Sequence, residues 1–116
     1  MSYRNAAVEL NKNIQIMEST FEANNLQVLG TACKPYADDD GDLILYIEVA
    51  SISGSKIKNS VQIKVNLYNK DNSLYMSKST WVSEDKFSGY DTFEIQCYDS
   101  SHTLDIAVKG RLYVTR

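Results

Sequence analysis

The sequence predicts an all-β protein, an antiparallel β-sandwich of about seven strands. Apolar and polar residues alternate along most of the chain, and the apolar positions are rich in β-branched residues, as in strands with one buried face. Clusters of Asn, Asp, Ser and Gly separate these segments, as expected for turns between antiparallel strands. The clearest example is the segment 61–68, which residues 69–72 follow as a turn.

The N-terminal segment fits two interpretations. Apolar residues recur at alternating steps of four and three over residues 3–21, which suits one face of a helix. Ile14 and Ile16 alternate as in a strand, and three nearby asparagines weaken a helix. We expect a short helix over residues 3–11 and a strand over residues 13–22, and the sequence leaves both conformations open.

The chain is expected to form a single sandwich domain over residues 13–116, preceded by an N-terminal extension over residues 1–12. Its 116 residues are close to the common size of one domain. A hydrophobic content of 43% supplies a core without help from metals or disulfides. No internal repeat or low-complexity tract divides the sequence.

Six strands follow a turn at Asn24 and Asn25. Pro35 closes the first of them, because proline cannot donate a hydrogen bond to a sheet. The strand over residues 43–50 is apolar on both sides at its start and is expected to be central. Gly110, within the last strand, is expected to mark a bulge. The six segments are 26–33, 43–50, 61–68, 73–82, 92–98 and 104–115.

Two cysteines, Cys33 and Cys97, lie in predicted strands. They could form a bridge across the core, or remain buried thiols that pack like small hydrophobic residues. Nothing in the sequence indicates an oxidising compartment. We recognise neither a signal peptide nor an apolar segment long enough to span a membrane. The protein is therefore expected to be soluble and cytoplasmic, or extracytoplasmic if a leader has been removed.

The charge of the chain argues against nucleic acid as a partner. The formal net charge is −3 and the pI is about 5.0, which disfavours binding to a phosphate backbone. Lys56, Lys58 and Lys64 lie among neutral residues and are interpreted as a solvated strand edge.

An acidic loop is a candidate calcium site. Asp38, Asp40 and Asp42 alternate, and Gly41 lets the backbone bend, so several carboxylate oxygens could meet a cation. The loop departs from an EF-hand, because Val49 stands where the twelfth position would be a glutamate. The other interpretation is a solvated loop at one end of the sandwich, with no cofactor.

Four of the eight tyrosines in the chain are candidate binding residues. Each of the four projects from the side of its strand opposite to the inward residues. Aromatic side chains with a polar tip are favoured anchors at binding surfaces. If their strands are neighbours in one sheet, they form a patch for a partner. The four are Tyr46, Tyr68, Tyr98 and Tyr113.

No motif predicts an enzyme. His102, the only histidine, follows Asp99, Ser100 and Ser101 in a polar turn, which is not the spatial arrangement of a catalytic triad. Trp81, the only tryptophan, could stack on a sugar ring, but a lone tryptophan at a strand end more often fills the margin of the core.

Residues Val65–Asn69 resemble the motif that names the FxLYD domain family, with Val65 in place of the phenylalanine and Asn69 in place of the aspartate. Asn72 stands where the turn after that motif usually has a glycine. Residues 87–95 resemble the family's later glycine-centred bend and the strand that follows it.

The resemblance covers about residues 43–115. It implies an immunoglobulin-like β-sandwich, often an accessory domain in bacterial or archaeal proteins, without catalytic residues. We therefore expect a non-catalytic interaction or accessory binding module that binds another protein or a second copy of itself. The alternative is a sandwich that binds carbohydrate or calcium through the acidic loop and Trp81.

Overall fold

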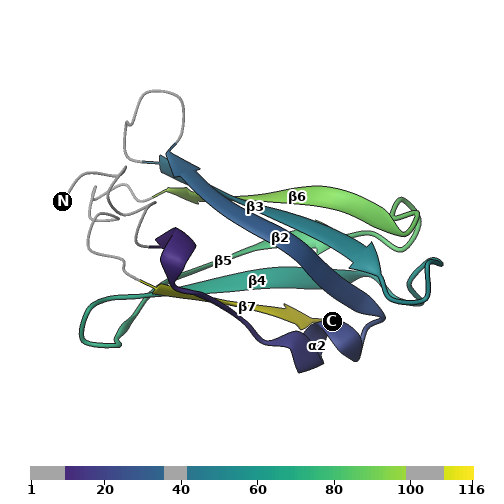
Figure 1. Cartoon of the computed structure of the whole chain (residues 1–116), viewed down its shortest axis with the longest axis horizontal. Helices are drawn as coiled ribbons and strands as arrows, with labels where there is room; N and C mark the ends of the chain where they lie inside the picture. The colour runs from purple at the N-terminus through teal and green to yellow at the C-terminus, as the bar shows by residue number, and fades with distance from the viewer. Residues whose placement is uncertain (1–9, 36–41, 99–108) are drawn as a thin grey trace.

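Two β-sheets pack face to face in the computed structural model, which describes residues 10–35, 42–98 and 109–116 (Figure 1). The four-stranded sheet has the order β1-β7-β4-β5, and the three-stranded sheet has the order β2-β3-β6. The all-β sandwich predicted from the sequence is confirmed. The strands are β1 (Ile14–Ile16), β2 (Leu26–Pro35), β3 (Asp42–Ser51), β4 (Val61–Tyr68), β5 (Leu74–Val82), β6 (Tyr90–Tyr98) and β7 (Lys109–Thr115).

Neighbouring strands are antiparallel except for β1, which pairs in parallel with β7 over three residues. The strand predicted to be central, β3, lies between β2 and β6. Of the last predicted strand, the structure describes the part from Lys109 onward, and residues 104–108 lie outside the described ranges.

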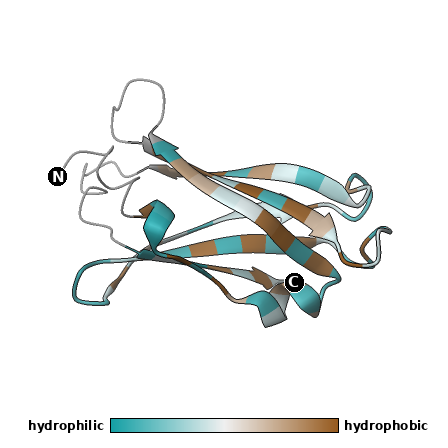
Figure 2. Ribbon diagram, in the orientation of Figure 1, coloured by the Kyte–Doolittle hydropathy of each residue, from teal (hydrophilic) through white to brown (hydrophobic). Residues whose placement is uncertain are grey.

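The core lies between the sheets and follows the alternation of the sequence. Brown and teal bands alternate along the strands in Figure 2, because every second side chain points inward. Along β4 the alternation is complete, and Ile63 and Val65 are fully buried. Leu10, just before β1, is also buried in this core, at 1% exposed.

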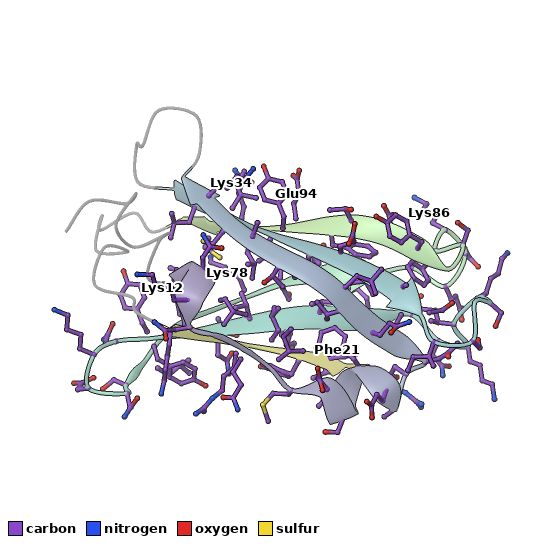
Figure 3. All side chains as sticks on the ribbon, in the orientation of Figure 1. Lys12, Phe21, Lys34, Lys78, Lys86 and Glu94 are labelled. Carbon is purple, nitrogen blue, oxygen red and sulfur yellow. The ribbon has the colours of Figure 1, made fainter. Side chains whose placement is uncertain are left out.

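The strand predicted over residues 13–22 is wrong beyond residue 16. The chain forms the short helix α2 (Glu18–Glu22) instead. The helix begins where Thr20 donates hydrogen bonds to Met17 O from both its backbone N–H and its hydroxyl. Its Phe21 side chain, 1% exposed, points into the sandwich (Figure 3). Because α2 contacts both β2 and β7, it closes this side of the core.

The bulge predicted at Gly110 is also wrong, since β7 pairs with β4 without a register shift there. The glycine instead allows close packing: a Cβ atom at this position would lie 3.0 Å from Ile14 Cδ1 and 3.2 Å from Leu67 Cδ2. The register shifts that the structure describes lie in β2, between Val28 and Gly30, and where β4 pairs with β5.

The cysteines are free and buried, so the bridge across the core is not formed. Cys33 lies on β2 and Cys97 on β6, which are separated by β3 in the same sheet. Burial raises the pKa of each thiol to about 12. Both residues are therefore packed as neutral thiols.

Candidate functional site

The structure divides the four candidate tyrosines into two groups. Tyr68 on β4 and Tyr113 on β7 share the outer face of the four-stranded sheet. Tyr46 on β3 lies on the outer face of the other sheet, on the far side of the sandwich. Tyr98 ends β6 in that same sheet, where its backbone pairs with Asp42, but its side chain lies outside the described part. The four do not form one patch.

Asn66 connects the tyrosines of the four-stranded sheet. Its Oδ1 accepts hydrogen bonds from Tyr113 Oη (3.2 Å) and from Ser77 Oγ (2.9 Å). Its Nδ2 lies 3.5 Å from Tyr68 Oη, to which it donates. The side chain thus links β4 to β5 and β7. Asn66 was not among the residues predicted to form a site, although alternation places it outward between Val65 and Leu67.

Two cations lie over the ring of Tyr68. Arg111 Cζ is 4.9 Å from the ring centroid, and Lys109 Nζ is 5.5 Å from it. The hydrogen bond from Asn66 is the largest cause that lowers the pKa of Tyr68, and Arg111 and Lys109 lower it further against a smaller opposing effect of desolvation. Arg111 Nε also donates to Gln15 Oε1 at 2.9 Å, which ties β7 to β1.

These residues belong to a larger surface, which we call the four-stranded outer face. It consists of the residues that project outward from β1, β7, β4 and β5, where cross-strand partners share one side of the sheet. Among the described residues of this face, aromatic, amide, hydroxyl and cationic side chains are present and none is acidic. They are Gln15, Gln62, Lys64, Asn66, Tyr68, Leu74, Ser77, Ser79, Trp81, Lys109, Arg111, Tyr113 and Thr115.

Trp81 also lies on this face, and the prediction that it fills the margin of the core is wrong. The side chain is 60% exposed and pairs across the strands with Gln62. The next residue, Val82, takes the inward position and is fully buried. Because successive side chains of a strand point to opposite faces, burial of Val82 directs Trp81 outward.

The opposite outer face has mixed charge. Lys34 Nζ lies 6.0 Å from the ring centroid of Tyr46. Tyr90 donates a hydrogen bond to Glu48 on the neighbouring strand, and this bond is the largest cause that raises the pKa of Tyr90. Glu94 on β6 pairs with Tyr46 on the same face. Carboxylates and a cation are both present on this face, unlike on the four-stranded outer face.

The proposed calcium loop falls mostly outside the described residues. Asp38 and Asp40 lie outside them, and for Asp42 only the backbone position in β3 is described. His102 also lies outside them. Among the residues that are described, no group of three His, Cys, Asp or Glu side chains could hold a metal ion. The same part of the chain has no helix of the length and apolar character needed to cross a membrane.

No protein-family model and no curated protein matches the chain. Among solved structures, the chain is similar to that of Campylobacter jejuni cj0090, with 12% identity and a TM-score of 0.48 over 88% of this chain and 95% of that one. It is also similar to a DUF1425 family member from Shewanella sp. pv-4, with 17% identity and a TM-score of 0.48 over 80% of this chain and 79% of that one. The FxLYD-like resemblance is not confirmed by these comparisons and stays a prediction.

Proposed function

We propose that this protein is a non-catalytic interaction module that binds an acidic region of a partner protein on the four-stranded outer face. The observation that carries the proposal is the cluster of Tyr68, Tyr113, Lys109 and Arg111 around Asn66 on a face without described carboxylates. An accessory role of this kind agrees with the FxLYD-like resemblance.

The aromatic side chains of this face are suitable anchors. Tyr, Trp and Arg are enriched among the few residues that dominate binding energy at protein interfaces, and the aromatic ones bring a large contact area with few rotatable bonds. Tyr68 and Tyr113 are held by Asn66, and Arg111 by Gln15. Because these side chains are already ordered, this face loses less conformational entropy when a partner binds.

The charges of the face favour an acidic partner. Lys64, Lys109 and Arg111 project from adjacent strands, whereas the whole chain has a net charge of −3. The remainder of the molecule is therefore more acidic than this face. Complementary charge mainly increases the association rate and selects the partner, and it does so more strongly at low salt.

A fluorescent random copolymer of Glu and Tyr is a suitable probe for this proposal. We expect it to bind with chemical-shift changes at Asn66, Arg111 and Tyr113 in NMR titrations. The paired variant Lys109→Gln and Arg111→Gln should weaken binding by about tenfold, equivalent to about 1.4 kcal/mol. As a control, Lys34→Gln with Lys86→Gln removes the same charge elsewhere and should leave the affinity unchanged. Equal losses in both paired variants would refute the proposal.

Two further measurements distinguish other partner classes. A single-stranded oligonucleotide should bind more weakly than the copolymer. If the oligonucleotide binds more tightly, the partner is a nucleic acid and not an acidic protein. Light scattering after size-exclusion chromatography tests the predicted self-association. A dimer that dissociates in the Lys109→Gln and Arg111→Gln variant would make a second copy the partner.

The exposure of Trp81 favours carbohydrate as a second candidate. A tryptophan that is 60% exposed on the outer face of a sheet can stack on the apolar face of a sugar ring. Binding of neutral oligosaccharides that is lost in Trp81→Ala and retained in Tyr90→Ala, an exposed aromatic of the opposite sheet, would support this alternative.

A further inference from the structure

A polar cleft opens at the end of the sandwich where β7 finishes. It lies between the turn after α2, the β3–β4 loop and Arg116, and its volume is about 520 Å³. Small-molecule sites commonly measure about 300–1,000 Å³. Three cationic side chains, Lys56, Lys58 and Arg116, line the cleft together with one carboxylate, Glu22. Positive charge therefore gathers here in a chain whose net charge is −3.

A buried isoleucine positions the two lysines. Ile57 is 6% exposed and belongs to the core cluster, whereas Lys56 and Lys58 on either side of it are exposed. The loop is also joined at its base to the β5–β6 turn, because Ser51 N–H donates to Gly89 O at 2.8 Å. The backbone of both lysines is thus anchored, although their side chains reach into water.

Asn25 holds the opposite wall against the same loop. Its Nδ2 donates to Ser53 Oγ at 2.8 Å, and its Oδ1 accepts from Ser53 N–H at 3.1 Å. Its backbone carbonyl accepts from Ile52 N–H at 3.0 Å. Asn25 adopts a φ of 61°, a left-handed conformation that asparagine tolerates better than most residues. These three bonds define the shape of the cleft without using its cations.

The cations remain available for a ligand. Among the described residues, Lys56 and Lys58 have no hydrogen bond or ion pair, and Arg116 donates from Nε to Asn24 Oδ1 at 3.4 Å. Asn59 adds an amide group to the lining, whereas the amide of Asn24 already donates to Thr20 O at 2.9 Å and accepts from Arg116. Ammonium and guanidinium groups form their strongest hydrogen bonds with oxyanions, and amides suit hydroxyl groups.

We propose that this cleft binds a small hydroxylated molecule that carries an oxyanion, either a sugar phosphate or a sugar carboxylate. Lys56 and Lys58 bind the oxyanion, and Asn59 binds hydroxyl groups. The site is separate from the four-stranded outer face, so each proposal can fail without the other. Because the cations are exposed, binding weakens as salt is added.

The test is an NMR titration of the full chain at low salt with glucose 6-phosphate, glucuronate and glucose. Saturable binding of at least one anionic sugar is expected, with shift changes centred on residues 52–59 and on Asn24. The anion that binds more tightly shows whether the cleft prefers a sugar phosphate or a sugar carboxylate. Glucose should bind at least about tenfold more weakly, since it forms no charge-assisted hydrogen bond.

Variants then assign the site. Lys56→Gln with Lys58→Gln should weaken binding by about tenfold or more. Lys70→Gln with Lys86→Gln removes two exposed lysines outside the cleft and should have no effect. The amide spectrum of each variant verifies that it is folded. The proposal is overturned if neither anion saturates below about 10 mM, a very weak affinity. It is equally overturned if glucose binds as well as the anions, if both pairs of variants behave alike, or if the shifts map to Tyr68 and Arg111.

Discussion

The side-chain amide of Asn11 pairs with both backbone hydrogen-bonding groups of Cys33. Asn11 Nδ2 donates to Cys33 O, and Cys33 N–H donates to Asn11 Oδ1, each at 2.7 Å. Cys33 lies on β2, an edge strand of its sheet. One asparagine side chain therefore takes the place that a neighbouring strand would occupy, and it attaches the residues before β1 to the sandwich.

Replacing Asn11 should destabilise this attachment. Asn11→Ala removes two hydrogen bonds, each with a net contribution of about 0.5–1.5 kcal/mol, so we expect a loss of about 1–3 kcal/mol in the free energy of unfolding. Urea denaturation measures it, and the amide of Cys33 should exchange faster with solvent. Gln96→Ala, at an exposed position of β6, should change stability by less than about 0.5 kcal/mol. An equal effect of both substitutions would contradict the role of the pair.

Two glycines provide a matched test of packing. In Gly110→Ala the new methyl group would meet Ile14 Cδ1 at 3.0 Å and Leu67 Cδ2 at 3.2 Å, so we expect a loss of about 1–3 kcal/mol. In Gly30→Ala the nearest atom is Glu48 Oε1 at 3.9 Å, and the lower entropy of the unfolded chain should leave stability unchanged or slightly increased. Thermal unfolding of both variants measures the difference. A Gly110→Ala variant as stable as the native chain would show that this contact is loose.

The thiols should be protected and should make stability depend on alkaline pH. Burial raises the pKa of Cys33 and Cys97 from 9.0 to about 12, so the folded chain keeps them neutral while the unfolded chain ionises them. The contribution of these two thiols to the free energy of unfolding is complete below about pH 9 and is lost as the pH rises towards 12. A thiol reagent at pH 8 should react slowly with the native chain and fast with both cysteines in denaturant.

A double Cys33→Ala and Cys97→Ala variant is the control, since tyrosines and lysines titrate in the same range. Its free energy of unfolding should fall less steeply above pH 9 than that of the native chain. Identical slopes would mean that the thiols are not desolvated.

The phenol of Tyr68 should ionise at a lower pH than an ordinary tyrosine. Asn66 donates to its oxygen, and Arg111 and Lys109 favour the phenolate. The difference in ultraviolet absorbance between the native chain and Tyr68→Phe isolates this titration. Asn66→Ala should raise the pKa back towards its usual value, whereas Gln96→Ala should leave it unchanged. A titration of Tyr68 at the ordinary tyrosine pKa would remove the electrostatic argument for the cluster.

Trp81 should report its exposed position by fluorescence. It is the only tryptophan, and its side chain is 60% exposed. We expect red-shifted emission and efficient quenching by acrylamide in the native state, with little increase on unfolding. A blue-shifted emission that acrylamide quenches only after denaturation would place the indole in the core.

The alternation of the sequence was sufficient for the β-sandwich and for the inward side of β3, β4 and β6. In β4, Ile63 and Val65 are buried as predicted, because a period of two belongs to the extended backbone and requires no knowledge of neighbouring strands. The same alternation places Trp81 outward, because Val82 beside it is inward. The general tendency of lone tryptophans to pack at the margin of the core gave the opposite prediction.

The segment that forms α2 shows where a local pattern is insufficient. Thr20 and Phe21 suit a strand by propensity, yet Phe21 becomes buried only because the helix turns it into the gap between β2 and β7. Likewise, Asn11 was interpreted as a residue that weakens a helix, yet residues 10–12 are helical and the Asn11 side chain bonds to a residue 22 positions away; residues 3–9 of the expected helix lie outside the described residues.

The sequence by itself determined which side of their strands Tyr46, Tyr68 and Tyr113 occupy, since that depends on adjacent residues alone. Only the tertiary structure decided that Tyr68 and Tyr113 meet at Asn66 while Tyr46 lies on the opposite face. It likewise decided that Lys56, Lys58 and Arg116 share one cleft. The physical reason is that strand order and loop placement arise from burial and hydrogen bonding between distant segments, which leave no local periodicity in the sequence.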